Sequence, residues 1–377
     1  MKILHITNGL TEGGVEMLLY DLCYETKKQG HDITILVLNK NEIKLAPLFE
    51  ELGIHILTGH PHTPYDFKNI IKIKKHLLNF DLVHVHQFPS QLYTAIALLC
   101  LPKKKRPIII TTEHSTFNNR RKYKIANIVD RFFYSKYQKI ICISKQTEIN
   151  LIKWINNKSI QNKIITITNG INIDKFANAI NICNEIIPIN PQYNYIVMVG
   201  RFDSPKDQMT LIKALKYCPN NTYLIFIGTG SNMQKCMIEA NNLGLTNRIY
   251  FIGHHNNVAG ILKGCKIGVL STQWDGFGLV AVEYMASGIP AVCSNVEGLR
   301  DVVGNGSLLF NPGNVNELAS LLNKLLNNTE FYNSMKSYCT NNAKKYSVKL
   351  MAQKYISLYQ DLYKQKDLNQ NYDSTQN

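Results

Sequence analysis

Twelve short runs of apolar, largely β-branched residues are spread along the chain, and each run is continuous rather than alternating. Continuous hydrophobicity is typical of strands covered on both faces, as in a parallel sheet flanked by helices. Longer helical patterns separate the runs, so the sequence predicts an α/β protein with two doubly wound, Rossmann-like domains. The runs lie at 2–7, 32–38, 82–86, 108–112, 139–144, 164–169, 195–200, 223–228, 249–253, 267–270, 291–294 and 307–310.

The length of 377 residues suits two domains, each of roughly 150–200 residues. We predict a first domain over 1–180 and a second over 195–345, joined by the proline- and asparagine-containing linker 181–194. Residues 346–365 predict a C-terminal helix that is able to cross back to the first domain. The polar residues 366–377 predict a disordered tail.

The cysteines and apolar segments are those expected of a cytoplasmic protein. The nine cysteines form no CxxC pair, and Cys142 and Cys293 lie inside apolar runs, which favours buried thiols over disulfides or a zinc site. The first residues predict a strand and lack the features of a signal peptide. The longest apolar run, 92–101, is about half of the ~20 residues that a membrane helix needs.

Ligands bind open parallel sheets beyond the carboxyl ends of the strands, so the loops there are the places to search for a site. The first loop ends in Gly13 and Gly14, just before an apolar helical pattern. A glycine-rich turn at a helix N-terminus presents backbone N–H groups and suits phosphate. A plain tight turn is the alternative. A dinucleotide is disfavoured, because the loop lacks the GxGxxG pattern.

The loop after the run 195–200 carries two permanent cations. Arg201 follows Gly200 directly, and Lys206 comes five residues later. A planar guanidinium and a compact ammonium on one loop are suited to clamping a diphosphate. Solvated surface cations are the alternative.

The segment "STQWDGFGLVAVEYMASGIP" (271–290) places Asp275 and Glu283 eight positions apart, on either side of a glycine-containing turn. The helix expected after Gly278 is apolar all round, which indicates burial. An unpaired buried carboxylate costs several kcal/mol, so Glu283 needs partners. These partners are either protein donors or the hydroxyl groups of a ligand such as a ribose. Gly276 and Gly278 leave room for phosphates above the helix N-terminus.

In this order and spacing, the motifs resemble those of glycosyltransferase family 4, which comprises retaining sugar-nucleotide enzymes of the GT-B fold. The resemblance covers roughly residues 1–360. Its most specific part is the E-x7-E signature, "DGFGLVAVEYMASGIPAVCS" in this chain. Supporting parts are "GGVE" (13–16), "VGRF" (199–202), "ITNGIN" (167–172) and "EGLRDVV" (297–303). The resemblance implies that the first domain faces the acceptor and the second binds the nucleotide sugar.

The resemblance also implies roles for individual residues. Glu283 would bind the nucleotide ribose, and His114 would lie near the transferred sugar. Asp275 would contact hydroxyl groups of that sugar, although it is one methylene shorter than the family's usual Glu. The implied catalytic residues are His114, Asp275, Arg201 and Lys206. The implied donor-binding residues are Gly13, Gly14, Arg201, Lys206, Gly253, His254, Gly276, Phe277, Gly278, Leu279 and Glu283.

The implied mechanism is electrostatic and needs neither a cofactor nor a metal. The chain has no D-x-D triplet. Arg201, Lys206 and the helix N-terminus near Gly278 would stabilise the charge that develops on the leaving nucleoside diphosphate. Closure of the two domains would exclude water from the site. No covalent carboxylate intermediate is expected.

Residues 103–145 hold twelve Lys and Arg against Glu113 and Asp130, within a chain whose net charge is +15. Cations interleaved with aromatic residues there suit an anionic membrane surface, where a lipid-linked or glycan acceptor would be found. We therefore expect peripheral attachment to the inner face of the cell membrane, a role in bacterial capsule, O-antigen or lipopolysaccharide synthesis, and no nucleic-acid partner. A solvated helix face is the alternative.

Three other functions would each explain part of the pattern. A nucleotide-sugar epimerase or hydrolase of the same fold would turn over the donor without an acceptor. An oxidoreductase would need a dinucleotide fingerprint that the first loop lacks. A non-enzymatic polyanion-binding protein would explain the charge but not Glu283, Arg201 and Lys206.

Overall fold

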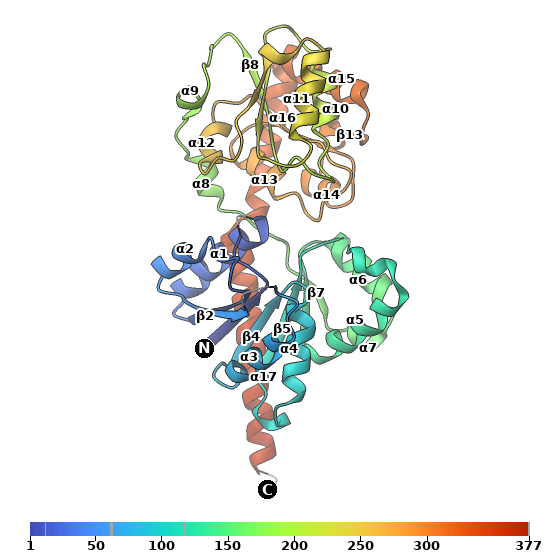
Figure 1. The fold of residues 1–377 in the computed structure, drawn as a ribbon. Helices are drawn as coiled ribbons and strands as arrows, with labels where there is room; N and C mark the ends of the chain where they lie inside the picture. Colours follow the sequence, from blue (N-terminus) through green and yellow to red (C-terminus); the bar gives the residue numbers. More distant parts are fainter. Residues whose placement is uncertain (12, 61–62, 117, 376–377) are drawn as a thin grey trace. The chain divides into compact units, whose positions relative to one another are not determined.

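The computed structural model describes residues 1–11, 13–60, 63–116 and 118–375, and Figure 1 shows the ribbon. The chain forms two compact units. The first comprises Met1–Gly170 and the C-terminal stretch that begins at Val348, and the second is Ile171–Ser347. Each unit is built on one sheet, and neighbouring strands are parallel. The two doubly wound parallel-sheet domains predicted from the hydrophobic runs are confirmed.

The described part of the first unit contains a seven-stranded sheet with the order β3-β2-β1-β4-β5-β6-β7. The predicted runs missed β3, which lies at the edge of the sheet and is partly exposed. With two histidines and a glycine in six residues, β3 lacks the continuous hydrophobicity of a buried strand. The strands are β1 (Lys2–Thr7), β2 (Asp32–Asn39), β3 (His55–His60), β4 (Leu82–His86), β5 (Ile108–Glu113), β6 (Lys139–Cys142) and β7 (Ile164–Thr166).

Helices cover both faces of this sheet. Successive residues of a strand point to opposite sides, so a strand that is apolar throughout presents apolar side chains on both faces. In β2, Ile35 and Val37 pack with residues of α1 and α2, whereas Leu36 and Leu38 join the core formed with α3, α4 and α5. The helices are α1 (Gly14–Lys28), α2 (Ala46–Glu51), α3 (Lys68–Leu77), α4 (Ser90–Leu99), α5 (Lys124–Lys136), α6 (Lys145–Ile155), α7 (Lys158–Gln161) and α17 (Val348–Thr375), with 3-10 turns at Lys103–Lys105 and Asn119–Lys122.

The last helix, α17, belongs to the first unit and packs against α1. The hydroxyl of Tyr359 lies 2.8 Å from Nδ1 of His84, and that of Tyr355 lies 3.1 Å from Oγ1 of Thr112. Residues 366–375, which the composition predicts to be disordered, are the helical end of α17, whereas 376–377 lie outside the described residues. Extending a helix that is already docked needs no new nucleation, so polar residues can continue it.

The second unit contains a parallel sheet with the order β10-β9-β8-β11-β12-β13. The strands are β8 (Asn194–Val199), β9 (Thr222–Ile227), β10 (Ile249–Phe251), β11 (Ile267–Leu270), β12 (Ala291–Ser294) and β13 (Leu309–Phe310). The helices are α8 (Ile173–Ala177), α9 (Cys183–Ile186), α10 (Gln208–Leu215), α11 (Met233–Asn242), α12 (Val258–Leu262), α13 (Leu279–Ala286), α14 (Leu299–Val303), α15 (Val315–Asn327) and α16 (Thr329–Ala343), with 3-10 turns at Thr246–Arg248, Gly306–Leu308 and Lys344–Tyr346.

The chain enters the second unit after Gly170, earlier than the predicted domain end at 180. The segment 181–194, predicted to be a linker, is part of this unit. Its helix α9 packs against α12, and the backbone N–H of Ile182 donates to the carbonyl of Gly260 at 3.3 Å. These contacts hold a segment that composition alone marks as irregular. No helix among the described residues is both long enough and apolar enough to cross a membrane.

Candidate active site

The carboxyl ends of the neighbouring strands β8 and β11 bring two loops of the second unit together. Lys206 and Thr272 form an isolated antiparallel bridge just beyond the strands. The ammonium of Lys206 lies 2.7 Å from Oδ2 of Asp275, and each of these side chains is 18% exposed. The backbone N–H of Phe277 donates to Oδ1 of Asp275 at 3.0 Å. Lys206 and Asp275 therefore form one partly buried ion pair, in which an Asx turn orients the carboxylate.

Glycines allow the loops after β11 and β12 to come into backbone contact. Gly278 precedes α13 with a φ of +88°, which glycine adopts readily. A Cβ atom on Gly278 would overlap the side chain of Leu299, and one on Gly298 would overlap the carbonyl of Asp275. Helix α13 begins four residues after Asp275, and the N–H groups of its first turn lack intrahelical partners.

Helix α13 is fixed to the sheet by Tyr284. The Tyr284 hydroxyl accepts from the N–H of Val199 at 2.8 Å and donates to the carbonyl of Val269 at 3.2 Å. Its ring lies so close to β11 that a Cβ atom on Gly268 would overlap it. Glu283, the neighbouring residue, is partly buried, while the residues on either side of it are fully buried. The hydrogen bonds and packing of Tyr284 thus fix the turn of α13 that carries Glu283.

The loops after β8, β9 and β10 follow one another along the same edge of the sheet. The N–H of Gly228 donates to the carbonyl of Gly253 at 2.7 Å, and a Cβ atom on Gly228 would overlap the carbonyl of Gly200. Arg201 and His254 are exposed there. The second-unit residues predicted for a donor site therefore lie at one sheet edge or on the helix that begins there.

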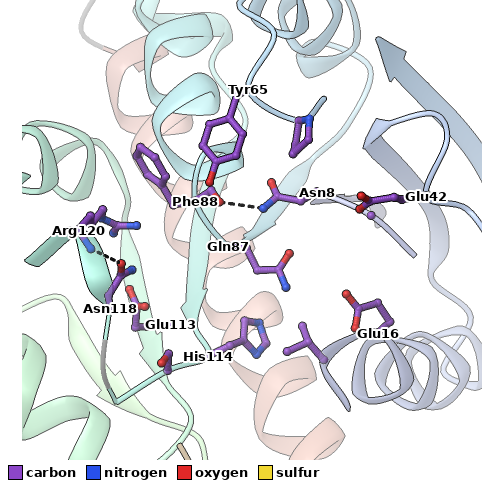
Figure 2. A pocket seen from close by; sticks show the side chains of 14 residues that line it. Asn8, Glu16, Glu42, Tyr65, Gln87, Phe88, Glu113, His114, Asn118 and Arg120 are labelled. Atoms are coloured by element: carbon purple, nitrogen blue, oxygen red, sulfur yellow. Dashed lines mark hydrogen bonds between the residues drawn. The ribbon is translucent and has the colours of Figure 1, made fainter. Parts of the chain in front are cut away.

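The first unit has its own pocket, of about 710 Å³, where β1, β4 and β5 end (Figure 2). Carboxylates, amides, aromatic rings and an imidazole line it, so it suits a polar ligand with an apolar face. The lining residues are Asn8, Gly9, Val15, Glu16, Glu42, Pro64, Tyr65, Gln87, Phe88, Glu113, His114, Ser115, Asn118 and Arg120.

Gly13 and Gly14 lie at the start of α1, outside the residues found to line this pocket. The carboxylate of Glu16 covers Gly13 so closely that a Cβ atom there would overlap it. Burial raises the pKa of Glu16, a backbone hydrogen bond lowers it, and the charge of Glu42 raises it. A carboxylate thus covers the helix N-terminus at which the sequence predicts a phosphate.

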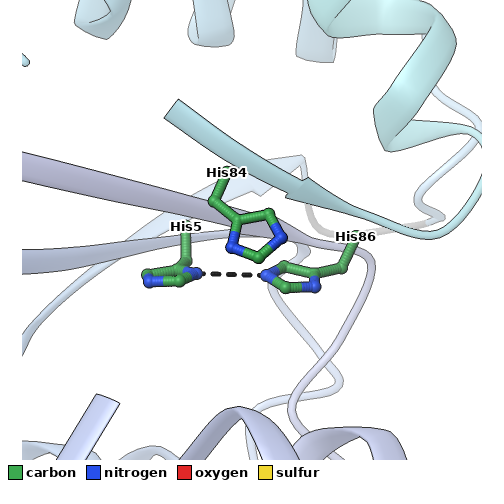
Figure 3. A group of neighbouring side chains, drawn as sticks. All are labelled: His5, His84 and His86. Atoms are coloured by element: carbon green, nitrogen blue, oxygen red, sulfur yellow. Dashed lines mark hydrogen bonds between the residues drawn. The ribbon is translucent and has the colours of Figure 1, made fainter. Parts of the chain in front are cut away.

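His114 follows β5 directly, and a chain of histidines lies behind it. Its Nε2 lies 3.1 Å from Nδ1 of His86, and Nε2 of His86 lies 3.1 Å from Nδ1 of His5 (Figure 3). Burial lowers the pKa of His114 to about 4, against the charge of Glu113, which raises it, so His114 is neutral at pH 7. Sequence reasoning missed His5 and His86, whose signal is their place inside the apolar strands "KILHIT" and "LVHVH".

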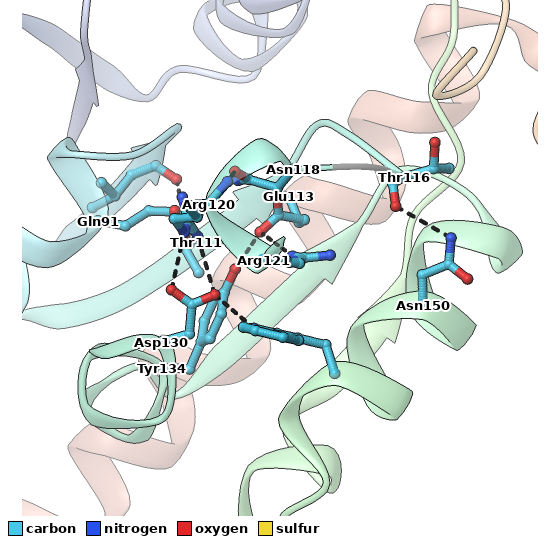
Figure 4. A network of polar contacts seen from close by, with 12 residues as sticks. Gln91, Thr111, Glu113, Thr116, Asn118, Arg120, Arg121, Asp130, Tyr134 and Asn150 are labelled. Atoms are coloured by element: carbon cyan, nitrogen blue, oxygen red, sulfur yellow. Dashed lines mark hydrogen bonds and ion pairs between the residues drawn. The ribbon is translucent and has the colours of Figure 1, made fainter. Parts of the chain in front are cut away.

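A buried polar network supports the pocket wall (Figure 4). Glu113 accepts from the hydroxyl of Tyr134 and lies 3.4 Å from Nη2 of Arg121. Sequence reasoning did not find this network, because it depends on which side chains meet when β5 and α5 pack.

Arg120 is held in place by a second part of the same network. Its guanidinium pairs with the buried Asp130 at 3.0 Å and lies 4.3 Å from the ring centroid of Phe88. Trp154 donates its Nε1–H to the same carboxylate at 2.8 Å. Burial raises the pKa of Asp130, whereas Arg120 lowers it. The cation and the aromatic ring at this wall are therefore preorganised.

Two family profiles match the chain, one on each unit. The profile described as Glycosyltransferase Family 4 matches residues 12–175, and the profile described as Glycosyl transferases group 1 matches residues 180–346. The chain belongs to glycosyltransferase family 4. Its two Rossmann-like units are those of a GT-B glycosyltransferase.

Individual relatives of this glycosyltransferase agree with that assignment. It is 26% identical over 296 residues to the Escherichia coli UDP-Gal:alpha-D-GlcNAc-diphosphoundecaprenol alpha-1,3-galactosyltransferase, covering 73% of this chain and 74% of the relative. It is 26% identical over 374 residues to an uncharacterized 41.2 kDa protein in the cps region of Klebsiella pneumoniae, covering 95% and 99%. The crystal structure of Anabaena HepE in complex with UDP and glucose superposes with a TM-score of 0.82 at 19% identity, covering 96% of this chain and all of that one.

Proposed function

We propose that this glycosyltransferase moves a sugar, with retention at the anomeric carbon, from a nucleoside diphosphate sugar to a lipid-linked or glycan acceptor in bacterial surface polysaccharide synthesis. The observation that carries the proposal is the Lys206–Asp275 ion pair beside the N-terminus of α13. The sugar nucleotide in the name of the Escherichia coli relative and the UDP in the HepE complex support the donor class. The cps relative supports the pathway.

The donor diphosphate would lie over the carboxyl edge of the second sheet. As the anomeric bond breaks, negative charge grows on the leaving diphosphate. Lys206, the exposed Arg201 and the N–H groups of the first turn of α13 would stabilise that charge. These groups take the place that a divalent cation has in other transferases, so we propose that the reaction needs no metal.

Glu283 and Asp275 would select the two sugars of the donor. Glu283, held in position by Tyr284, would accept hydrogen bonds from the ribose diol. Asp275, which contacts Lys206 and the N–H of Phe277, would accept a hydrogen bond from a hydroxyl group of the transferred sugar. Its short side chain closes the Asx turn, which a glutamate at this position would not form.

The decisive experiment is a thermal-shift screen of the full chain against UDP-, GDP- and ADP-sugars. A ligand that binds the folded state must raise its melting temperature. We expect one nucleotide series to do so, and Glu283→Ala and Lys206→Met to weaken the shift. Lys213→Met is the matched control, because Lys213 pairs with Glu239 at 3.6 Å in the same unit but on the surface of α10.

Three outcomes would contradict the proposal. Stabilisation by no sugar nucleotide at millimolar concentration would refute the donor site. An equal loss of the thermal shift in Lys206→Met and Lys213→Met would show that nucleotide binding does not depend on the Lys206–Asp275 ion pair. Donor turnover that never depends on an added acceptor would favour an epimerase or a hydrolase.

The membrane part of the proposal rests on α5 of the first unit. Ile125, Ile128 and Phe132 have the i, i+3, i+7 spacing of one helix face and are 72%, 69% and 38% exposed. Tyr123 precedes them at 68% exposure, and Lys103–Lys105 and Lys124 are exposed in the same segment. An apolar stripe with flanking cations suits the cytoplasmic surface of an anionic membrane, where a lipid-linked acceptor would lie.

Co-sedimentation with vesicles tests this surface. We expect the full chain to bind vesicles rich in phosphatidylglycerol and to release at high salt, but not to bind pure phosphatidylcholine. The double substitution Ile125→Ser and Ile128→Ser should abolish binding. Ile238→Ser, at a 53% exposed isoleucine of the second unit, is the control. Undiminished binding by the double variant would reject α5 as the contact.

A further inference from the structure

Four histidines of the first unit lie close together in space. His5 of β1 pairs in register with His84 of β4, and His86 follows two residues later on the same face of that strand. His114 comes directly after β5, whose Thr112 pairs with His86. Three of them, His5, His84 and His86, are fully buried or nearly so, and each has a ring nitrogen within 4.8 Å of the others.

Such a cluster is able to hold a metal ion, but its hydrogen bonds point to a different role. Metal ligands direct their lone pairs at a common third point. Here Nδ1 of His5 and Nε2 of His86 face each other at 3.1 Å, with the rings only 17° from parallel (Figure 3). Both nitrogens of His84 are already bonded, to Tyr359 at 2.8 Å and to Thr112 at 2.7 Å. The nitrogens are paired with one another rather than convergent.

The bonds of the other three rings form one directed chain, His5–His86–His114. Each imidazole is neutral, because burial lowers the pKa of His5 to about 3, that of His114 to about 4 and that of His86 well below its usual value. A neutral imidazole has one N–H donor and one acceptor nitrogen, so the nitrogen that carries the proton in one ring fixes the tautomer of the next ring. Only two arrangements of the protons satisfy both the His5–His86 and the His86–His114 hydrogen bonds.

The buried end of this histidine chain, His5, distinguishes the two arrangements. Nε2 of His5 is buried and has no hydrogen-bond partner among the described residues. If His114 donates to His86 and His86 donates to His5, Nε2 of His5 must carry a proton and is a buried N–H without an acceptor. In the opposite direction, which we call outward, His5 donates to His86 and His86 donates to His114, and Nε2 of His5 is an unpaired acceptor. Orphaned buried N–H groups are the rarer of the two in proteins. The outward arrangement is therefore favoured, with a proton on Nδ1 of all three rings.

We infer that His5 and His86 are positioning residues that lock His114 into its Nδ1–H tautomer, so that it donates a hydrogen bond to a ligand oxygen in the pocket. Nδ1 is the nitrogen of His114 that the chain leaves unused. The carboxylates of Glu16 and Glu113 line the same pocket (Figure 2). Together these groups would bind a polyhydroxylated ligand, whose hydroxyls donate to the carboxylates and accept from His114. That use of the N–H rests on the proposed transferase function, whereas the tautomer does not.

The test is a long-range ¹H–¹⁵N correlation spectrum of the full chain labelled at histidine, with His114 assigned by its loss in His114→Gln. Protonated and bare ring nitrogens have distinct ¹⁵N shifts, so the spectrum reports the tautomer directly. We expect Nδ1–H for His114 at pH 7. In His86→Leu, the donor to Nε2 of His114 is missing, and we expect His114 to become a mixture of tautomers. His84→Gln is the matched control and should leave His114 unchanged.

Each result decides the inference. A His114 that carries its proton on Nε2 in the unsubstituted protein overturns it, even if every variant fails to fold. A His114 tautomer that is unchanged in a folded His86→Leu variant overturns the role of His86. A shift of all three buried histidine signals on adding Zn²⁺ would establish a metal site in place of the chain. Failure to find any transferase activity would leave the tautomer result standing and reject only its proposed use.

Discussion

The ammonium of Lys206 lies 2.7 Å from Oδ2 of Asp275, although 69 residues separate the two in the chain. The pair exists because β8 and β11 are neighbours in the sheet and both loops leave it at the same edge. The carboxylate is shared between the ammonium and the backbone of its own turn. An ion pair in this position both orients the cation and holds the turn from which α13 begins.

Two substitutions of Asp275 separate its charge from its length. Asp275→Asn keeps an oxygen for the Asx turn but removes the charge that orients Lys206. We expect it to lower kcat by about 100-fold, the scale observed when one preorganised charge-stabilising group is lost. Because both side chains are only 18% exposed, the stability loss should lie between the about 1 kcal/mol of a surface pair and the about 3–5 kcal/mol of a buried one. Asp275→Glu keeps the charge, so a loss of kcat as large as that of Asp275→Asn would show that the turn matters as much as the charge. Steady-state kinetics and urea denaturation measure the two effects.

Gly278 and Gly288 form a matched pair at the two ends of α13. Their φ values are +88° and +82°, but a Cβ atom would overlap Leu299 at Gly278 and meet nothing within 4 Å at Gly288. Gly288→Ala should lower the free energy of unfolding by about 1–2 kcal/mol through the left-handed backbone alone. Gly278→Ala should lower it further, and adding Leu299→Ala should restore part of that difference. Equal losses in urea denaturation of the two single variants would contradict the overlap.

Tyr284→Phe should uncouple Glu283 from the sheet. The substitution leaves the N–H of Val199 without its acceptor, which costs about 1–3 kcal/mol when such a group is buried. We expect weaker nucleotide binding as well as lower stability, because α13 loses its contact with β8. Tyr338→Phe, which removes a hydroxyl bonded to the carbonyl of Val303 at 3.0 Å, is the control for stability alone. Isothermal titration calorimetry with the stabilising nucleotide measures the affinity. An unchanged affinity in Tyr284→Phe would refute the coupling of Tyr284 to the Glu283 site.

The buried histidines predict that acid destabilises the first unit. The folded-state pKa values of His5 and His114 lie at about 3 and about 4, below the ordinary 6.5. Between these values and 6.5, the unfolded chain therefore binds more protons than the folded one. The contribution of the two histidines to the free energy of unfolding is fully present above pH 6.5 and is lost progressively as the pH falls toward 4. Each extra proton contributes a slope of about 1.4 kcal/mol per pH unit. Urea midpoints measured from pH 7.5 to pH 4 should fall less steeply in His5→Leu than in the unsubstituted chain, and parallel curves would contradict the assignment.

The same pKa direction has a consequence for activity. Because His114 stays neutral above about pH 4, it contributes no inflection to kcat/KM near pH 6.5. An inflection near that pH that disappears in His114→Gln would show that the imidazole titrates in the free protein.

The features that sequence analysis predicted correctly are local ones. Continuous hydrophobic runs mark buried parallel strands, and twelve of the thirteen described strands, all but β3, coincide with such runs. The edge strand β3 escaped because half-buried residues need no continuous hydrophobicity. The prolines and asparagines of 181–194 predict a linker, and the sequence places 171–180 in the first domain, yet packing of α8 against α13 and of α9 against α12 makes 171–194 part of the second unit.

For the site, the order of strands, glycine turns and cations along the chain was enough to predict the family, the two-domain fold and the loops that carry Arg201, Lys206 and Asp275. Those signals are short-range, since turn chemistry and strand period involve residues a few positions apart. The ion pair of Lys206 with Asp275, the covering of Gly13 by Glu16 and the chain from His5 through His86 to His114 were not predictable in this way. They arise only when distant strands become neighbours and the alternation of their side chains brings particular atoms face to face.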